Sequence, residues 1–529
     1  MSSRLARSAG VISIATMASR LLGVVRETVL ASLFGASGGP AMDAFNVAFR
    51  VPNLVRDLFA EGAMTAAFVP TFTRTLVTQG RDAAWRLGNL VINALLIVTG
   101  ALVVIGIIFA EPITRLMAWG DKFRAVPGKL ELTMQLTRIM MPFLPTIAVA
   151  VAMMGMLNSL HRFFVPALSP AMFNVATIVC AFVVVPYMPA IGLPPIAGIA
   201  IAAVLGGIGQ ILVQWPSLAK EGFRYRPILD FKDPGVREIL RLMGPGTLGL
   251  AAVQINVVIN TALASTQEQG AVSFLQYAFR LMYLPIGLFG VSIASAALPD
   301  ISRQAGEEDK SAMRGTIASG LRMMLMLNVP ATIGLIVLAQ PIVEFLLQYR
   351  AFTSHDTAAT AAALMFYAPG LIGYSAVKIA SPSFYALGEA RTPVIVSMAS
   401  VGLNLVLNIM LVGVMGYRGL ALGTAISALF NAAMLLYFLQ ERLGGLEGRR
   451  ISIVFTKILA ASALMGVAAY FAAAWLNGML PGDGWYLRGV RVFTAIGAGV
   501  SVLLISARLL GIGELSLAIN RVLRRITRR

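Results

Sequence analysis

Charged and polar side chains recur at helical spacing in residues 43–61, DAFNVAFRVPNLVRDLFAE, a stretch otherwise apolar enough to enter a membrane. On an α-helix, spacings of 3, 4, 3, 4 and 4 align them along one face; the residues are Asp43, Asn46, Arg50, Asn53, Asp57 and Glu61. A charge facing lipid is costly, so this face is expected to look into a bundle interior or a watery cavity. We therefore predict a binding cavity here. The alternative is a set of packing ion pairs that neutralise one another.

Arginines at membrane depth indicate which ligand such a cavity would take. Five lie in or beside the expected spans: Arg20, Arg26, Arg50, Arg56 and Arg280. The guanidinium group offers a fixed fork of donors that fits phosphate oxygens in pairs, and it stays charged at any accessible pH. A pyrophosphate or another polyanion would suit this cluster.

The candidate site is therefore defined by side chains expected to touch the ligand and by acids expected to neutralise arginines. The expected ligand contacts are Arg20, Arg26, Asp43, Arg50, Asn53, Arg56, Glu61 and Arg280, and the expected counter-charges are Glu27 and Asp57.

Composition places the chain among polytopic membrane proteins. Of 529 residues, 58% are hydrophobic and only 12% are charged, which is too apolar for an ordinary soluble protein. The single cysteine, Cys180, excludes a disulfide framework, and His161 and His355 lie far apart in the sequence. We expect no metal site and no cofactor. No P-loop or nucleophile elbow is present, so transport is favoured over catalysis.

Apolar runs between breakers predict an all-α protein with fourteen transmembrane helices. The expected spans lie near 9–34, 42–73, 86–110, 132–159, 166–188, 194–218, 237–264, 271–301, 316–340, 357–387, 392–415, 419–440, 452–476 and 487–510.

Basic residues concentrate in alternate loops and in the tail RVLRRITRR, which predicts that both termini are cytoplasmic. The opposite side receives few; they include Arg115, Lys122, Arg124, Lys129 and Arg418. This asymmetry accounts for the net charge of +18 without nucleic acid as a partner.

An internal repeat organises the chain. The stretch AFRVPNLVRDLF from Ala48 reappears as AFRLMYLPIGLF from Ala278, which places Arg280 at the position of Arg50. EPITRLMA from Glu111 resembles QPIVEFLLQ from Gln340 at nearly the same offset. Six expected spans separate the copies, and an even number predicts two six-helix lobes in the same orientation. Chance similarity between apolar helices is the alternative.

The repeat and the breakers together predict five parts. These are an N-lobe of spans 1 to 6 (1–218), a solvated cytoplasmic linker (219–236), a C-lobe of spans 7 to 12 (237–443), two extra helices (444–511) and a basic cytoplasmic tail (512–529).

Three segments carry a resemblance to a known family: SRLLGVVRE from Ser19, MDAFNVAFRVPNLVRDLFAEGAMTAAFVP from Met42, and YAFRLMYLP from Tyr277. With them, essentially the whole chain resembles the MurJ family, also called MviN, of lipid II flippases. The resemblance implies the fold of the multidrug/oligosaccharidyl-lipid/polysaccharide exporters, with two six-helix lobes around a central cavity. The resemblance also implies two further helices that form a lipid-accessible groove.

What the resemblance implies for function is export of a peptidoglycan precursor from the inner to the outer leaflet of the bacterial cytoplasmic membrane. The precursor, lipid II, is a disaccharide pentapeptide on undecaprenyl pyrophosphate. The family's cavity arginines correspond to Arg20, Arg26, Arg56 and Arg280, and its acid in the second span to Asp43. Relatives often carry acids beside the eighth-span arginine, where this chain has Phe279 and Tyr283.

The expected mechanism is alternating access by a monomer, with the headgroup in the cavity and the prenyl tail in lipid. Coupling to the membrane potential or to a monovalent ion is left open. The rival interpretations are a flippase for another polyprenyl-linked glycan, a drug exporter of the same fold, and a non-transporting scaffold for cell-wall enzymes. A membrane glycosyltransferase is disfavoured by the short loops.

Overall fold

The computed structural model describes residues 2–57, 64–287 and 291–513, and all regular structure in these ranges is helical. The chain divides into two compact units, Met1–Ser273 with Tyr349–Phe352, and Phe274–Gln348 with Thr353–Arg529. Each is described here by itself.

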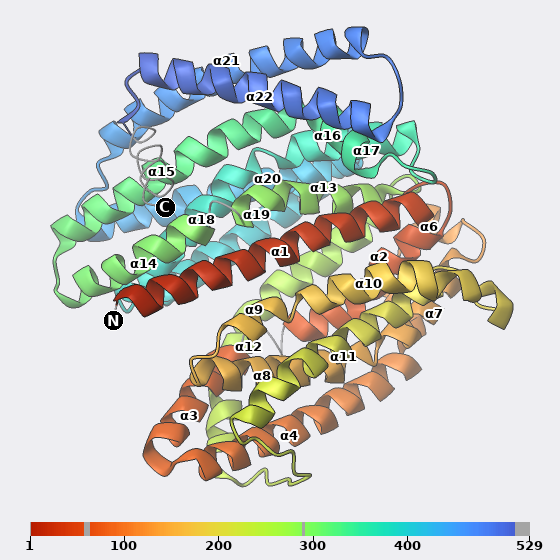
Figure 1. Cartoon of the computed structure of the whole chain (residues 1–529), viewed down its shortest axis with the longest axis vertical. Coiled ribbons are helices and arrows are strands. Elements are labelled where there is room, and N and C mark those ends of the chain that lie inside the picture. The colour runs from red at the N-terminus through yellow and green to blue at the C-terminus, as the bar shows by residue number, and fades with distance from the viewer. Residues whose placement is uncertain (1, 58–63, 288–290, 514–529) are drawn as a thin grey trace. The chain divides into compact units, whose positions relative to one another are not determined.

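The first unit holds twelve helices and two short 3₁₀ turns within the described residues (Figure 1). They are α1 (Ser2–Phe34), α2 (Ala41–Val55), α3 (Met64–Gln79), α4 (Arg81–Ile108), α5 (Ala110–Met117), α6 (Asp121–Arg124), α7 (Lys129–Met140), α8 (Phe143–Ser159), α9 (Phe164–Leu168), α10 (Ala171–Val183), η2 (Val185–Tyr187), η3 (Pro189–Ile191), α11 (Ala197–Lys220) and α12 (Pro234–Ser265).

The second unit begins inside α13 and runs through the C-terminal helix pair, which lies side by side in Figure 1. Its helices are α13 (Ala271–Pro285), α14 (Val291–Gly306), α15 (Lys310–Val337), α16 (Ala339–Leu347), α17 (Ser354–Tyr367), α18 (Gly370–Ala386), α19 (Arg391–Met415), α20 (Tyr417–Leu443), α21 (Gly448–Met479) and α22 (Trp485–Leu509).

The helix order repeats as the sequence repeat predicts. Helices α2 and α13 have 15 residues each, α4 and α15 have 28, and α8 and α18 have 17. Both α2 and α13 pass into π-helical conformation after their last α-helical residue, at 56–57 and 286–287. The similarity of the two copies is therefore present in the backbone and not only in the apolar composition.

Prolines break several of the expected continuous spans. The expected span 132–159 is two helices, because α8 starts anew after Pro142, and 357–387 bends by 44° where α18 starts after Pro369. The expected spans 42–73 and 271–301 each contain two described helices. Within the described residues, nine helices are long and apolar enough to cross a membrane, or ten if the bent pair counts as one.

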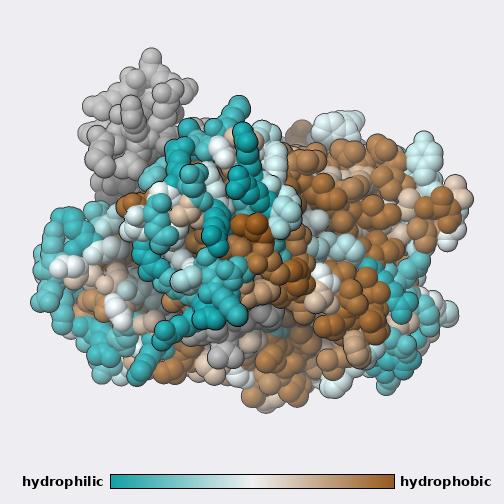
Figure 2. All heavy atoms as spheres, turned by 90° about the horizontal axis from the view of Figure 1, so that it is seen from below, coloured by the Kyte–Doolittle hydropathy of each residue, from teal (hydrophilic) through white to brown (hydrophobic). Residues whose placement is uncertain are grey.

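Apolar side chains face both the interior and the surroundings. In the first unit Phe68, Phe72 and Met156 are buried where α3, α4 and α8 meet, and in the second Ile379 and Leu435 are buried in a cluster with α15. Large apolar side chains also cover a broad area of the surface shown in Figure 2, bordered by hydrophilic residues. An exposed apolar exterior is typical of helices that contact lipid.

The packing division differs from the predicted lobes. Helix α12, placed in the C-lobe by the repeat, packs against α3, α4 and α5, and the boundary between units follows Ser273. By its contacts, α12 belongs to the first unit, whereas by its place in the sequence repeat it belongs to the C-lobe.

The linker is hydrogen-bonded to α4, although most of its side chains are exposed as the sequence predicts. The Asn89 amide donates to the Arg224 carbonyl at 3.0 Å and accepts from the Arg226 backbone N–H at 2.8 Å. Asn93, one helical turn further along α4, donates to the carbonyls of Arg226 and Ile228, both at 2.8 Å. Two buried asparagines therefore satisfy the backbone of this extended segment.

Candidate anion-binding site

Asp43 lies in the first turn of α2 and is 1% exposed. Lys129, also 1% exposed, donates to Asp43 Oδ2 at 2.8 Å, and the backbone N–H of Gly270 donates to the same oxygen at 2.8 Å. The other oxygen accepts from the Ser273 backbone N–H at 3.0 Å and from the Ser273 hydroxyl at 2.6 Å. Four donors from the chain itself occupy the carboxylate.

These contacts give Asp43 a positioning role in this structure. Gly270 and Ser273 flank the first residues of α13, whose N–H groups have no partner inside the helix. A carboxylate at a helix N-terminus satisfies such donors and complements the helix dipole. Asn46 extends the network, because its amide donates to the Ser273 hydroxyl at 3.1 Å. In this structure Asp43 holds α2, α7 and the start of α13 together, and its predicted contact with a ligand stays a prediction.

Lys129 is the residue that sequence reasoning misplaced. It was expected in an outer loop, but it is the first residue of α7 and is buried against Asp43, with its Nζ 4.2 Å from the centre of the Phe123 ring. A buried ammonium group needs a carboxylate partner close by. The sequence separates these two residues too widely for spacing to have indicated the pair.

The remaining polar residues of α2 are less buried. Arg50 and Asn53 are half-buried, and Asn53 Oδ1 is a buried oxygen with no hydrogen-bond partner within the described part of the chain. Arg56 Nη2 lies 2.8 Å from Asp57 Oδ1, and Gln254 on α12 donates to Asp57 Oδ2 at 3.3 Å. Glu61, the last predicted member of this face, lies outside the described residues.

Helix α1 brings the second arginine group. Arg26 pairs with its neighbour Glu27, with 3.0 Å between Arg26 Nε and Glu27 Oε1, and its guanidinium carbon lies 5.2 Å from the centre of the Phe173 ring. Arg20 is half-buried two turns earlier on the same helix. Each predicted counter-charge, Glu27 and Asp57, thus lies against the arginine that precedes it in the chain.

Arg280 belongs to the second unit, where it is half-buried on α13. The preceding residue, Phe279, packs among aromatic rings: its ring centre lies 5.5 Å from that of Tyr283, 5.5 Å from that of Tyr367 and 6.2 Å from that of Tyr374. The positions where relatives often carry acids are therefore used for ring packing between α13, α17 and α18.

Among the described residues of the predicted site in the first unit, arginines outnumber acids. The arginines are Arg20, Arg26, Arg50 and Arg56, and the acids are Glu27, Asp43 and Asp57, of which Asp43 pairs with Lys129. No group of three or more His, Cys, Asp or Glu side chains among the described residues could hold a metal ion. Guanidinium groups in excess over acids suit an anion with several oxygens.

Comparison with known proteins gives one consistent family. The model of the family described as "Lipid II flippase MurJ" matches residues 30–482. "Probable lipid II flippase MurJ" of Vibrio cholerae is 34% identical over 524 residues, which covers 97% of each chain. "Lipid II flippase MurJ" of Burkholderia cenocepacia is 35% identical over 431 residues, covering 81% of this chain and 82% of that protein.

Solved structures agree with the sequence relatives. The structure titled "Lipid II flippase MurJ, inward closed conformation" is similar with a TM-score of 0.76 and 27% identity, covering 94% of this chain and 98% of that one. An inward-facing multidrug transporter of the MATE family has a TM-score of 0.67 at 17% identity, covering 82% of this chain and 99% of that one, which supports a shared fold alone.

Proposed function

Because the chain belongs to the MurJ family of lipid II flippases, we propose that it moves lipid II from the inner to the outer leaflet of the bacterial cytoplasmic membrane. The observation that carries this proposal is that four arginines of the predicted site, Arg20, Arg26, Arg50 and Arg56, outnumber its acids among the described residues of the first unit. Lipid II carries its negative charge chiefly on a pyrophosphate between the prenyl chain and the sugars. A cationic drug would be repelled by the same arginines.

The arginines would act as a set of exchangeable partners. In this structure Arg26 and Arg56 are neutralised by Glu27 and Asp57. A bound pyrophosphate would replace these carboxylates, because it offers more oxygens in bidentate geometry. Arg20 and Arg50 would supply the further donors. Exchange between an internal and a substrate anion avoids leaving a bare charge at membrane depth in either state.

Asn53 fits the same site as an uncharged hydrogen-bond acceptor. Its amide oxygen is buried and has no hydrogen-bond partner in the described ranges, and Arg50 is one helical turn away on α2. An unsatisfied buried acceptor gains free energy from a donor. A hydroxyl or amide of the sugar headgroup would supply that donor, so we assign Asn53 to the substrate's neutral part.

Alternating access to the two leaflets would complete transport, and the membrane potential can drive it. Moving one negative charge out of an inside-negative cell gains about 2.3 kcal/mol per 100 mV. We propose that a monomer with both termini in the cytoplasm performs this cycle, without a catalytic step. A sodium ion or a proton as the coupling ion would add to the electrical term.

The test is depletion of the protein in its host, followed by labelling of lipid II that is accessible from outside. Lipid II is expected to accumulate in the inner leaflet, and Arg56→Ala at normal abundance is expected to reproduce this. Arg115→Ala is the matched control, because Arg115 forms an exposed ion pair with Glu111 on α5. Unchanged outer labelling in the depleted cells would refute the proposal, and growth supported by Arg56→Ala would favour a scaffold.

A further inference from the structure

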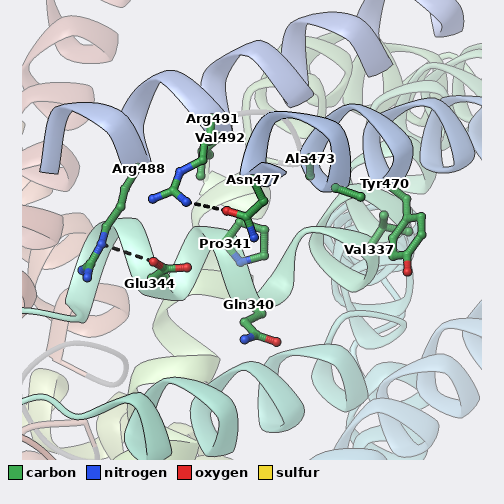
Figure 3. A pocket seen from close by; sticks show the side chains of 11 residues that line it. Val337, Gln340, Pro341, Glu344, Tyr470, Ala473, Asn477, Arg488, Arg491 and Val492 are labelled. Carbon is green, nitrogen blue, oxygen red and sulfur yellow. Dashed lines mark hydrogen bonds and ion pairs between the residues drawn. The ribbon is translucent and has the colours of Figure 1, made fainter. Parts of the chain in front are cut away.

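A second polar site lies in the second unit, on helices other than α13. It is a cavity of about 290 Å³ between α16, the end of α15 and the C-terminal pair α21 and α22. Figure 3 shows Arg488 and Arg491 projecting from α22 toward Glu344 on α16 and Asn477 on α21. The family activity proposed above does not use these residues.

Arg488 is the central cation of the cavity. It is 8% exposed, its Nη1 donates to the Gln348 carbonyl at 2.6 Å, and its Nε lies 3.2 Å from Glu344 Oε1. The Nε–H group and Glu344 Oε1 are close enough for an ion pair but are not aligned for a hydrogen bond. Arg488 Nε is therefore a buried donor without a hydrogen-bond partner in the described part of the chain. A buried donor left unsatisfied is costly, and an incoming acceptor would recover that free energy.

The charge balance of the lining favours an anion. Arg488 and Arg491 face one lining carboxylate, that of Glu344. Asp483 is 3.8 Å from Arg488, but its side chain is 93% exposed, where solvent screens it. Arg491 is held in place by Asn477 and by the Gly482 carbonyl at 2.8 Å, which directs its guanidinium along the cavity wall.

Exposed aromatic side chains of α21 and α22 point to the depth of lipid headgroups. They are Tyr470, which lines the cavity, and Trp475, Trp485 and Tyr486. Tyr and Trp are enriched at membrane interfaces, where an apolar ring meets lipid and its polar end meets water. With the predicted topology, the start of α22 lies at the outer interface.

We propose that this cavity binds the phosphate of an anionic phospholipid from the outer leaflet. The phosphate oxygens accept from Arg488 Nε and from Arg491, while the acyl chains follow the apolar exteriors of α21 and α22. The volume lies at the lower limit of about 300 Å³ for ligand pockets, which suits a glycerophosphate group and is too small for a disaccharide pentapeptide. The bound lipid is therefore a resident that ties α16 to the C-terminal helix pair, and it is distinct from the transported lipid.

The experiment measures lipid binding to the purified full-length protein by native mass spectrometry. The probes are phosphatidylglycerol, zwitterionic phosphatidylcholine and undecaprenyl pyrophosphate. Arg491→Gln is expected to weaken phosphatidylglycerol binding about tenfold, the loss of one charge-assisted contact, while Arg491→Lys loses less. Arg418→Gln is the matched control, because Arg418 is exposed on the outer side of the same unit and does not line the cavity.

A second variant tests the cavity without removing charge. Ala474 lines it and is exposed, so Ala474→Phe should obstruct the space and abolish selective phosphatidylglycerol binding even if Arg491→Gln fails to fold. Equal phosphatidylglycerol affinity in Ala474→Phe and wild type would overturn the proposal. So would an equal loss in Arg418→Gln, or a loss confined to undecaprenyl pyrophosphate.

Discussion

Helices α2 and α13 have the same backbone conformation but carry different types of side chain. Both are 15 residues long, both continue into π-helical conformation, and both carry an arginine at the same position, Arg50 and Arg280. Around the first arginine the copy carries acids and amides, whereas around the second it carries rings. The comparison teaches that the repeat preserves the position of a cation while the types of side chain around it differ between the copies.

The same contrast recurs at the ends of the two repeats. In the first unit Arg162, after α8, pairs at 2.8 Å with Glu221, after α11. In the second unit Glu389, after α18, pairs at 2.9 Å with Arg442 near the end of α20. The positions of the ion pair are equivalent, but its polarity is reversed. The two copies thus share the positions of the paired residues, but the acid and the base have exchanged places.

The largest effect should come from breaking the network around Asp43 of α2. Lys129→Ala leaves the Asp43 carboxylate buried without its cation, which should destabilise the protein by about 3–5 kcal/mol. Thermal unfolding in detergent, followed by tryptophan fluorescence, measures the loss.

The control for Lys129→Ala removes both charges. The double variant Asp43→Asn/Lys129→Met should lose clearly less stability than the single one, because no bare charge is left. A single variant as stable as the wild type would show that the buried pair does not hold the start of α13.

Removing the shared cation tests whether both copies contact the ligand. Arg50→Ala and Arg280→Ala should each weaken binding of undecaprenyl pyrophosphate about tenfold or more, since each loses charge-assisted hydrogen bonds of about 1.5–3 kcal/mol. Binding to the purified protein by thermophoresis measures this, with the exposed Arg303→Ala as control. An effect from only one of the two arginines would mean that the copies have different roles.

Restoring an acid to the second copy sharpens the comparison. Tyr283 is 36% exposed and lies three residues after Arg280, one turn along the helix. Tyr283→Glu should place a carboxylate one turn from Arg280, where it competes with the pyrophosphate and weakens its binding a few-fold. Tyr283→Gln is the uncharged control. If both variants weaken binding equally, the loss comes from disrupted ring packing and not from charge.

The smallest effect concerns the reversed ion pair at the end of the second repeat. The Thr392 hydroxyl, and then Arg442, hold the pKa of Glu389 below its ordinary value of 4.5, although partial burial opposes them. A lowered folded-state pKa contributes stability above pH 4.5 that is lost as the pH falls through the folded-state pKa. Thermal unfolding at pH 3.5 and 6 should show slightly less acid destabilisation in Glu389→Gln. Identical pH dependence would contradict this.

Sequence alone predicted the membrane class, the helical fold, the repeat and the family. These follow from local properties: apolar length, the spacing of polar residues along a helix and a recurring arginine motif. It also predicted that Glu27 and Asp57 would oppose arginines, because each lies next to one in the chain.

Only the tertiary structure decided the partners of residues far apart in the sequence. Lys129 was expected in a loop and is buried against Asp43, the linker is fastened by Asn89 and Asn93, and Arg488 lies in a cavity beside Glu344. Each of these contacts joins helices or loops that are far apart in the sequence. The spacing of residues along a single helix therefore cannot predict it. Whether a charge is neutralised, buried or left to bind a ligand depends on which helix packs beside it, and packing is a property of the whole fold.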